Sequence, residues 1–266
     1  FRFGYITKSK ATEAALEKIN IQPLANNIRA PHFVFYIKDL LTEKLGSRFV
    51  SQGGLKIYTT LDLKLQEEVE KTVKEEVEKL TNLSVNNGAA MVLDAATGQI
   101  LAMVGSRDYH YPGFGNFNVA LALRQPGSSI KPITYATAFE KGYTPDSIIL
   151  DTPVTFRDGT NAYSPVNYDG KFRGPVSLRQ ALGSSLNIPA VKLLATVGID
   201  SFFQKARDLG ISTFNDPARF GISLTLGGGE TRMIEMMGVY GAFSQNGLYH
   251  QPTGILKVTD SNNNVL

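Results

Sequence analysis

The chain has 266 residues, of which 42% are hydrophobic and 19% are charged. This balance supports a folded core and excludes a largely disordered or low-complexity protein. The formal net charge is only +3, and no basic stripe interleaved with aromatic residues indicates a nucleic-acid surface. Cysteine is absent, which excludes disulfides, thiolate nucleophiles and zinc–thiolate or iron–sulfur sites.

The three histidines, His32, His110 and His250, are scattered, and none stands four residues from another or beside an acidic cluster. The sequence therefore has no zincin-type motif, and we expect neither a metal site nor a cofactor. No apolar run approaches the roughly 18 residues that span a bilayer, and no signal-peptide pattern begins at Phe1. We expect the chain to be part of a longer protein.

The first fifth of the chain predicts little regular structure. Residues 6–19 carry apolar side chains at helical spacing and predict a short helix. Residues 21–54 are broken by prolines and glycines, which predicts an irregular connector with one helix at 33–45. An aromatic run at 32–36 favours an ordinary buried patch over contact with a membrane surface.

Residues 55–104 give stronger local signals. Residues 55–59 predict a strand, and Asp62 is placed to cap the helix that follows. The apolar seam of that helix consists of Leu65, Val69, Val73, Val77 and Leu80. Its solvent-exposed face is predicted to carry the i, i+4 ion pairs Glu67–Lys71, Glu70–Lys74 and Glu75–Lys79. Residues 89–93 and 99–104 predict a hairpin, with Gly98 in its turn.

The pattern becomes helical after Gly115. The predicted helices lie near 128–141, 177–184, 189–197, 201–208 and 231–245. Pro189 is placed as a first helical residue, and residues 157–174 predict a long surface loop. Strand structure returns at 247–258. This order predicts an α+β fold in which helices pack on an antiparallel sheet.

Ser128 and Lys131 are the first residues that suggest chemistry. Without cysteine or clustered histidine, a covalent mechanism needs a locally activated serine, threonine, lysine or carboxylate. A spacing of three at a helix start puts both side chains on one face, so the amine can reach the hydroxyl. The positive helix terminus favours a developing oxyanion and a neutral lysine that accepts the serine proton. We also expect Gly127 to let another segment approach closely.

The spacing S-x-x-K alone is a weak signal, because a chain of this length contains about one by chance. Here it occurs once, inside the string RQPGSSIKP, where Pro126 and Pro132 stiffen the entry to the helix. This context favours a catalytic interpretation.

A second candidate is the turn Ser185-Leu186-Asn187, 57 residues after Ser128 in the string ALGSSLNIPAV. It lies between two predicted helices, so both polar side chains can point from the turn into a cleft. The hydroxyl can relay a proton, and the carboxamide can donate to and accept from a peptide. The spacing S-x-N recurs where ordinary turns are expected, at Ser84/Asn86, Ser244/Asn246 and Ser261/Asn263.

The two motifs together resemble those of class A, bifunctional penicillin-binding proteins. Longer stretches also resemble that family: GLKIYTTLDLKLQEEVE, GAAMVLDAATGQILAMVG, FNVALALRQPGSSIKPITY and LGGGETRMIEMMGVYGAFSQNGLYHQP. The resemblance implies a penicillin-binding, serine β-lactamase-like transpeptidase fold that is incomplete at its C-terminus. It divides the chain into the tail of a glycosyltransferase domain (1–20), an inter-domain linker (21–85) and the transpeptidase domain (86–266).

The resemblance also implies roles for four residues. Ser128 is the nucleophile that attacks the penultimate D-Ala carbonyl of a stem pentapeptide, and Lys131 is the general base. Ser185 shuttles the proton, and Asn187 donates to the substrate amide. β-Lactams acylate Ser128 as substrate mimics, and half of the oxyanion hole is the N–H of Ser128.

The implied setting is the extracytoplasmic face of a bacterial membrane, with the anchor segment outside this chain. The implied partners are peptidoglycan stem pentapeptides, a lipid-linked precursor, β-lactams and other cell-wall synthesis or division proteins.

One element of the family pattern is missing. No Lys-Thr-Gly occurs, and Pro252-Thr253-Gly254 lacks the lysine. The resemblance therefore implies that half of the oxyanion hole and the carboxylate-binding cation lie outside the chain, as do the glycosyltransferase carboxylates. The alternative is a catalytically incomplete scaffold of the same fold that binds cell-wall or division partners.

Other enzyme classes fit less well. A serine β-lactamase needs an E-x-x-L-N loop, which the sequence lacks. A G-x-S-x-G hydrolase needs a glycine two residues after its serine and a triad histidine, but no glycine follows Ser129 at that spacing and no such histidine is evident. The triple glycine 227–229 lacks the Gly-Lys-Ser/Thr of a phosphate loop. It favours a turn before a helix whose Met233, Met236 and Met237 belong to the core.

Overall fold

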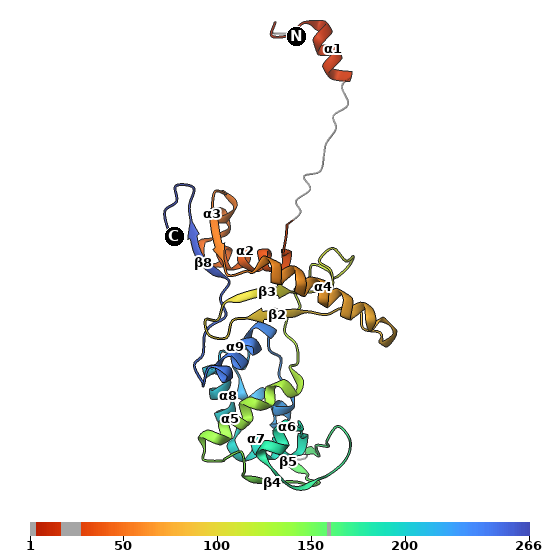
Figure 1. Cartoon of the computed structure of the whole chain (residues 1–266), viewed down its shortest axis with the longest axis vertical. Coiled ribbons are helices and arrows are strands. Elements are labelled where there is room, and N and C mark those ends of the chain that lie inside the picture. The colour runs from red at the N-terminus through yellow and green to blue at the C-terminus, as the bar shows by residue number, and fades with distance from the viewer. Residues whose placement is uncertain (1–3, 17–27, 159–160) are drawn as a thin grey trace.

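The computed structural model describes residues 4–16, 28–158 and 161–266. Helix α1 (Lys8–Leu16) lies apart from the rest of the molecule, and its side chains are exposed apart from half-buried Ala11 (Figure 1). The helix predicted at 6–19 is thus confirmed within the described residues, whereas the end of its apolar stripe, Ile19, lies outside them.

The upper part of the molecule is built on the hairpin β2 (Ala90–Leu93) and β3 (Ile100–Val104), as predicted. Helices α2 (Pro31–Leu45) and α4 (Leu63–Lys79) pack on β3, and α9 (Met233–Ser244) contacts β2 from below (Figure 1). Buried side chains from α2 and the hairpin form one core: Phe33, Ile37, Leu41, Ile100 and Met103. The aromatic run therefore contributes to a buried patch, as predicted.

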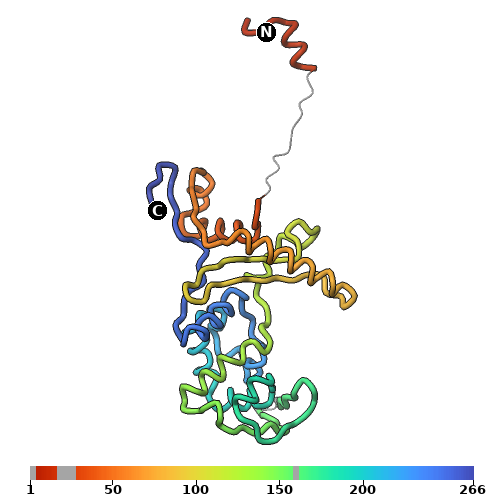
Figure 2. Tube along the Cα trace, in the orientation of Figure 1, coloured from red at the N-terminus to blue at the C-terminus, as the bar shows by residue number. Residues whose placement is uncertain are grey.

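Strand β1 (Lys56–Thr59) pairs antiparallel with β8 (Ile255–Thr259), almost 200 residues later in the chain. The Cα trace shows the C-terminal segment folding back beside the segment that follows the short helix α3 (Ser47–Ser51) (Figure 2). The predicted return to strand at 247–258 is correct only from Ile255 onward. The helix α3 was not predicted.

Helix α4 follows part of its sequence pattern: Val77 of the predicted seam is buried, whereas Leu80 lies just past the end of the helix and is 39% exposed. The Asp62 carboxylate accepts from the amides of Lys64 and Leu65, both at 3.0 Å, which caps the helix as predicted. The expected ion pairs are wrong: the pairs that α4 forms in the described chain are Lys71–Glu75, Lys79–Glu76, Arg29–Glu67 and Arg107–Glu78. Such exposed pairs are weak, so small differences in side-chain rotamer decide the partner.

The lower part of the molecule is mainly helical (Figure 1). It contains α5 (Lys131–Glu140), α6 (Leu178–Gly183), α7 (Asn187–Val197) and α8 (Ile199–Asp208), with the lower end of α9. A second core fills the space between these helices, with fully buried Tyr135, Phe202, Phe203 and Phe214 among its largest side chains. The α+β prediction is confirmed, with four two-stranded antiparallel sheets in the described residues.

The segment predicted as a surface loop, 157–174, has more structure than expected. Strands β5 (Phe156–Asp158) and β6 (Asn161–Tyr163) form a hairpin, and β7 (Gly174–Ser177) pairs with β4 (Ile148–Asp151). Asn167 is only 3% exposed. The β5–β6 hairpin is local, but β4 and β7 pair residues 23 to 29 positions apart, which local patterns do not reveal.

Short 3₁₀ turns complete the chain: η1 (Thr81–Leu83), η2 (Gly127–Ile130), η3 (Pro217–Arg219) and η4 (Ile222–Leu226). Pro189 is the third residue of α7 rather than the first, because the helix already begins at Asn187. Helix α5 likewise begins at Lys131, three residues later than predicted, because Ser128 lies in η2.

Candidate active site

Ser128 lies in turn η2, directly before α5, with its side chain exposed. The turn begins with Gly127 at a φ of 57°, a conformation that glycine adopts without cost. Two hydrogen bonds involve the next residue: Ser129 Oγ donates to Pro126 O at 2.6 Å, and the Tyr240 hydroxyl on α9 donates to Ser129 O at 2.9 Å. The candidate nucleophile therefore lies on a braced turn that remains open to solvent.

The close approach expected at Gly127 is made by Gly227, which follows η4. A Cβ on Gly227 would overlap the backbone of Gly127, whereas a Cβ on Gly127 would meet no described atom within 4 Å. The glycine required for this contact is therefore Gly227, in the triple glycine for which the sequence predicts a turn. Gly227 has a φ of 91°, as a turn after η4 requires.

Lys131 is the first residue of α5 and is only 1% exposed. Its Nζ donates to Ser185 O at 2.6 Å, to Ser185 Oγ at 3.1 Å and to Asn187 Oδ1 at 2.8 Å. Burial lowers the pKa of Lys131 from 10.5 to about 8. At neutral pH the amine is thus much closer to losing its proton than an exposed lysine.

Ser185 lies in the turn between α6 and α7 with a left-handed φ of 53°. A non-glycine residue adopts this conformation at a cost of about 1–3 kcal/mol, and such strain clusters at functional sites. The turn is closed by Ser185 N–H donating to Leu182 O at 2.9 Å. In this conformation, both the carbonyl and the hydroxyl of Ser185 face Lys131 Nζ.

Asn187 begins α7 and is half-buried. Its Oδ1 accepts from Lys131 Nζ, and its Nδ2 donates to Val166 O at 2.9 Å. The side-chain amide is therefore oriented by one donor and one acceptor. A donation from Nδ2 to substrate, as the resemblance implies, requires exchange of the Val166 bond.

The structure brings Lys131, Ser185 and Asn187 into one hydrogen-bonded network, and it leaves Ser128 outside that network. Within the described part of the chain, no hydrogen bond joins the Ser128 hydroxyl to Lys131 Nζ, so the expected direct contact is not made. The reason is the burial of Lys131: its three N–H donors are satisfied by the 185–187 turn, while Ser128 remains at the surface.

Two side chains that the sequence does not predict support the site, one at the Ser128 turn and one at the Lys131 network. Tyr240 fixes the carbonyl of Ser129, and Asn167 contacts the start of α7. Neither side chain forms a recognisable sequence motif with its partner. Tyr240 lies 111 residues from Ser129, and Asn167 lies 20 residues from Asn187. For Asn167 the available signal is the Gly-, Asn- and Tyr-rich composition of 157–174, which predicts a loop.

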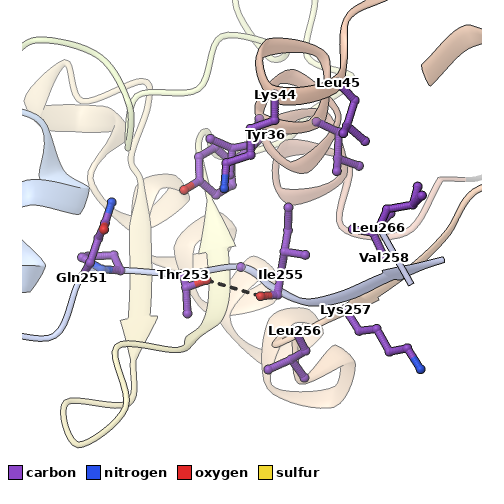
Figure 3. A pocket seen from close by; sticks show the side chains of 14 residues that line it. Tyr36, Lys44, Leu45, Gln251, Thr253, Ile255, Leu256, Lys257, Val258 and Leu266 are labelled. Atoms are coloured by element: carbon purple, nitrogen blue, oxygen red, sulfur yellow. Dashed lines mark hydrogen bonds between the residues drawn. The ribbon is translucent and has the colours of Figure 1, made fainter. Parts of the chain in front are cut away.

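Three further observations concern the surroundings of the site and the rest of the described chain. A pocket between α2 and the 251–258 segment, with Tyr36, Lys44 and Thr253 in its lining, is formed by a different set of residues (Figure 3). Among the described residues, no group of three or more histidine and carboxylate side chains is arranged to hold a metal ion. No helix of the described ranges has both the length and the apolar character to cross a bilayer.

The chain matches the family described as penicillin binding protein transpeptidase domain over residues 88–265, and it belongs to that family. This confirms the family resemblance, and the matched range includes η2, α5 and the 185–187 turn.

Relatives and solved structures agree with the assignment. Penicillin-binding protein 2D of Bacillus subtilis is 34% identical to the chain over 269 residues, which covers 98% of the chain and 38% of that relative. The crystal structure of penicillin-binding protein 1A from Haemophilus influenzae gives a TM-score of 0.79 at 22% identity, covering 100% of this chain and 53% of that one. PonA1 from Mycobacterium tuberculosis in complex with penicillin V gives a TM-score of 0.73 at 23% identity, covering 89% and 65%.

The chain thus spans well under half of the Bacillus relative, and the structural matches support the fold.

Proposed function

We propose that this chain belongs to a peptidoglycan D,D-transpeptidase that cross-links stem peptides through an acyl-enzyme on Ser128. The observation that carries the proposal is the state of Lys131: a lysine only 1% exposed, with a pKa of about 8, one turn from an exposed serine. A general base needs an amine that is neutral near physiological pH, and a lowered pKa provides it. A lysine with a purely structural role does not need a lowered pKa.

In the proposed acylation, the Ser128 hydroxyl oxygen attacks the carbonyl of the penultimate D-Ala. The serine proton passes to neutral Lys131 Nζ, and the carbonyl electrons move to the oxygen of a tetrahedral intermediate. When the intermediate collapses, the bond to the terminal D-Ala nitrogen breaks and that nitrogen takes up the proton. The amine of a neighbouring strand then attacks the Ser128 ester, loses a proton and restores the serine hydroxyl.

Ser185 fits the role of proton shuttle. A protonated Lys131 donates to Ser185 O, Ser185 Oγ and Asn187 Oδ1, and these three acceptors satisfy its three N–H groups. When the amine is neutral it has a lone pair, to which the Ser185 hydroxyl at 3.1 Å can donate. The direction of this bond reverses with the charge of Lys131, which is what a proton relay requires. The Ser128–Lys131 contact itself would form as substrate binds, since catalytic hydrogen bonds are often long before that.

The developing negative charge requires nearby donors. Ser128 lies just before the N-terminus of α5, where unpaired N–H groups and the helix dipole favour an oxyanion. The Ser128 N–H is the proposed first donor, and the second belongs to the third family motif.

The wider assignment rests on the relatives. We propose the division into glycosyltransferase tail (1–20), linker (21–85) and transpeptidase domain (86–266), the bifunctional role, and a location at the extracytoplasmic face of the membrane. The PonA1 structure is a complex with penicillin V, which supports binding of β-lactams here. Stem pentapeptide, lipid-linked precursor and other cell-wall or division proteins are the proposed partners.

The test is covalent labelling of the intact protein with a fluorescent penicillin. We expect stable labelling that is lost in Ser128→Ala and retained in Ser129→Ala, whose hydroxyl is held by Pro126 O. Peptide mass mapping should place the adduct on Ser128. Labelling that survives in Ser128→Ala would contradict the assigned nucleophile. An unlabelled but folded wild type would favour the scaffold alternative.

A further inference from the structure

Asn167 caps helix α7 from a distance. Its Oδ1 accepts from the amides of Asn187 at 2.8 Å and Ile188 at 3.3 Å. The first amides of a helix have no intrahelical partner, and in the described chain the N-cap residue Leu186 offers no side-chain hydrogen bond. The Asn167 side chain therefore supplies what a serine or aspartate at the N-cap supplies in other helices.

The orientation of the Asn167 amide is set by Asp151 on β4. Asp151 is fully buried, and both of its carboxylate oxygens accept from Asn167 Nδ2, at 2.8 and 3.0 Å. Nδ2 also lies 2.8 Å from Lys171 O. A flipped amide would place its oxygen against the carboxylate and its N–H groups against the helix amides, so only one orientation satisfies every partner.

Asp151 itself is balanced by Arg173. The Arg173 amide donates to Asp151 Oδ2 at 3.0 Å, and the Arg173 guanidinium lies 3.8 Å from the same oxygen. A buried carboxylate with these partners is a stable anchor for a neutral donor such as Asn167.

The same segment controls both the backbone and the side chain of Asn187. Asn167 holds the Asn187 amide, and the preceding Val166 O accepts from Asn187 Nδ2. With Nδ2 fixed on Val166, Asn187 Oδ1 must face the opposite way, toward Lys131 Nζ at 2.8 Å. A continuous chain of hydrogen bonds thus runs from Asp151 through Asn167 and Asn187 to the candidate general base.

We propose that Asn167 is a positioning residue for acylation: oriented by Asp151, it fixes Asn187 so that Asn187 holds the Lys131 amine. The inference rests on the proposed function, since it assigns Asn167 a role in the chemistry of the same site. Asn167 acts through Asn187 and is not proposed to touch substrate.

The sharpest test is a donor–acceptor swap. Asn167→Asp places two carboxylates face to face, and we expect the second-order rate of penicillin acylation to fall about 10- to 100-fold. The double variant Asp151→Asn/Asn167→Asp restores a donor at 151 and an acceptor at 167, so acylation should return to within about threefold of wild type. Tyr168→Phe is the matched control, because Tyr168 is fully exposed on the same loop, and this variant should acylate like wild type.

A second readout separates positioning from general loss of structure. If Asn167 acts through Asn187, then Asn167→Ser should slow acylation about tenfold in the wild-type background and hardly at all in an Asn187→Ala background. Additive losses in the two backgrounds would overturn the proposal, and so would a folded Asn167→Ser protein that acylates at the wild-type rate. Asn167→Ser also provides the comparison if Asn167→Asp fails to fold.

A third readout does not depend on acylation. Amide hydrogen exchange at Asn187 and Ile188 should be at least about tenfold faster in Asn167→Ser than in wild type, because their acceptor is lost. Unchanged exchange would contradict the cap. A wild type that takes no penicillin would instead contradict the proposed function, while the exchange measurement still decides whether Asn167 holds α7.

Discussion

The backbone of Gly227 packs directly against the backbone of Gly127, so a Cβ on Gly227 would overlap the nitrogen and Cα of Gly127 and lie 2.6 Å from its carbonyl oxygen. Gly127 begins the turn that carries Ser128. The segment after η4 therefore packs against the turn that carries the candidate nucleophile, and it supports the position of that turn.

Gly227→Ala should displace the Ser128 turn. The added methyl group overlaps η2, and alanine is strained at the φ of 91° found at this position, so we expect the free energy of unfolding to fall by about 1–3 kcal/mol. Acylation by a fluorescent penicillin should slow by about 10-fold or more, because the nucleophile moves. Urea denaturation and labelling kinetics measure the two effects.

The next residue is the control. A Cβ on Gly228 would lie 3.5 Å from its nearest neighbour, Ser223 O, which is ordinary contact. Gly228→Ala should therefore leave both stability and labelling close to wild type. Equal behaviour of the two variants would show that the Gly127 contact has no role.

Tyr240→Phe tests the second support of the same turn. Burial raises the pKa of Tyr240, so its hydroxyl stays protonated through the neutral range and donates to Ser129 O at 2.9 Å. Because Tyr240 is 45% exposed, water can replace the lost bond, and we expect stability to change by less than about 1 kcal/mol. Acylation should slow by about 3- to 10-fold as the turn loosens.

Tyr168→Phe is the matched control, since Tyr168 is fully exposed. A Tyr240→Phe protein with wild-type labelling kinetics would show that the Tyr240 hydroxyl does not support the Ser128 turn.

Local sequence patterns predicted the parts of the fold that local interactions stabilise. The Asp62 cap and the hairpin with Gly98 in its turn both depend on residues within a few positions of one another. The reactive motif could be found for the same reason: Ser128 and Lys131 are three residues apart, and Ser185 and Asn187 are two apart.

Interactions between distant segments could not be predicted in this way. From the sequence alone, Asn167 is typical of a turn residue. Its role depends on contacts with Asp151, 16 residues earlier, and with the start of α7, 20 residues later. The missing Ser128–Lys131 contact has the same origin, because the acceptors that hold the Lys131 amine come from 54 and 56 residues away. Periodicity and capping signals contain no information on such partners.

Gln66 is another polar residue whose burial the helical pattern did not predict. It is fully buried on α4, where its Oε1 accepts from Met103 N at 2.7 Å and its Nε2 donates to Met103 O at 3.0 Å. Gln66→Leu leaves both backbone groups of Met103 unpaired, so we expect a loss of about 2–4 kcal/mol in the free energy of unfolding. Urea denaturation measures it.

Gln204→Leu removes an exposed amide whose partners in the described chain, Asp208 and Arg207, lie on the same helix, α8, and it should change stability by less than about 0.5 kcal/mol. A Gln66→Leu protein as stable as this control would show that the α4–β3 link is unimportant.

Lys131 should make both stability and acylation depend on pH in a defined direction. Its pKa is about 8 in the folded protein, against 10.5 for an exposed lysine. Between these values the unfolded chain keeps a proton that the folded chain releases, so the free energy of unfolding of wild type should rise with pH relative to Lys131→Met. The full rise is on the order of 3 kcal/mol, with Lys64→Met controlling for loss of an exposed charge.

The kinetic consequence has the same origin. If neutral Lys131 is the base, acylation should increase about tenfold per pH unit below 8 and level off above it, and Lys131→Ala should lower the rate at least about 100-fold. A stability difference that rises with pH together with a pH-independent acylation rate would mean that Lys131 is buried as described but does not take the serine proton. Measuring both on one set of variants therefore separates the location of the amine from its role in the reaction.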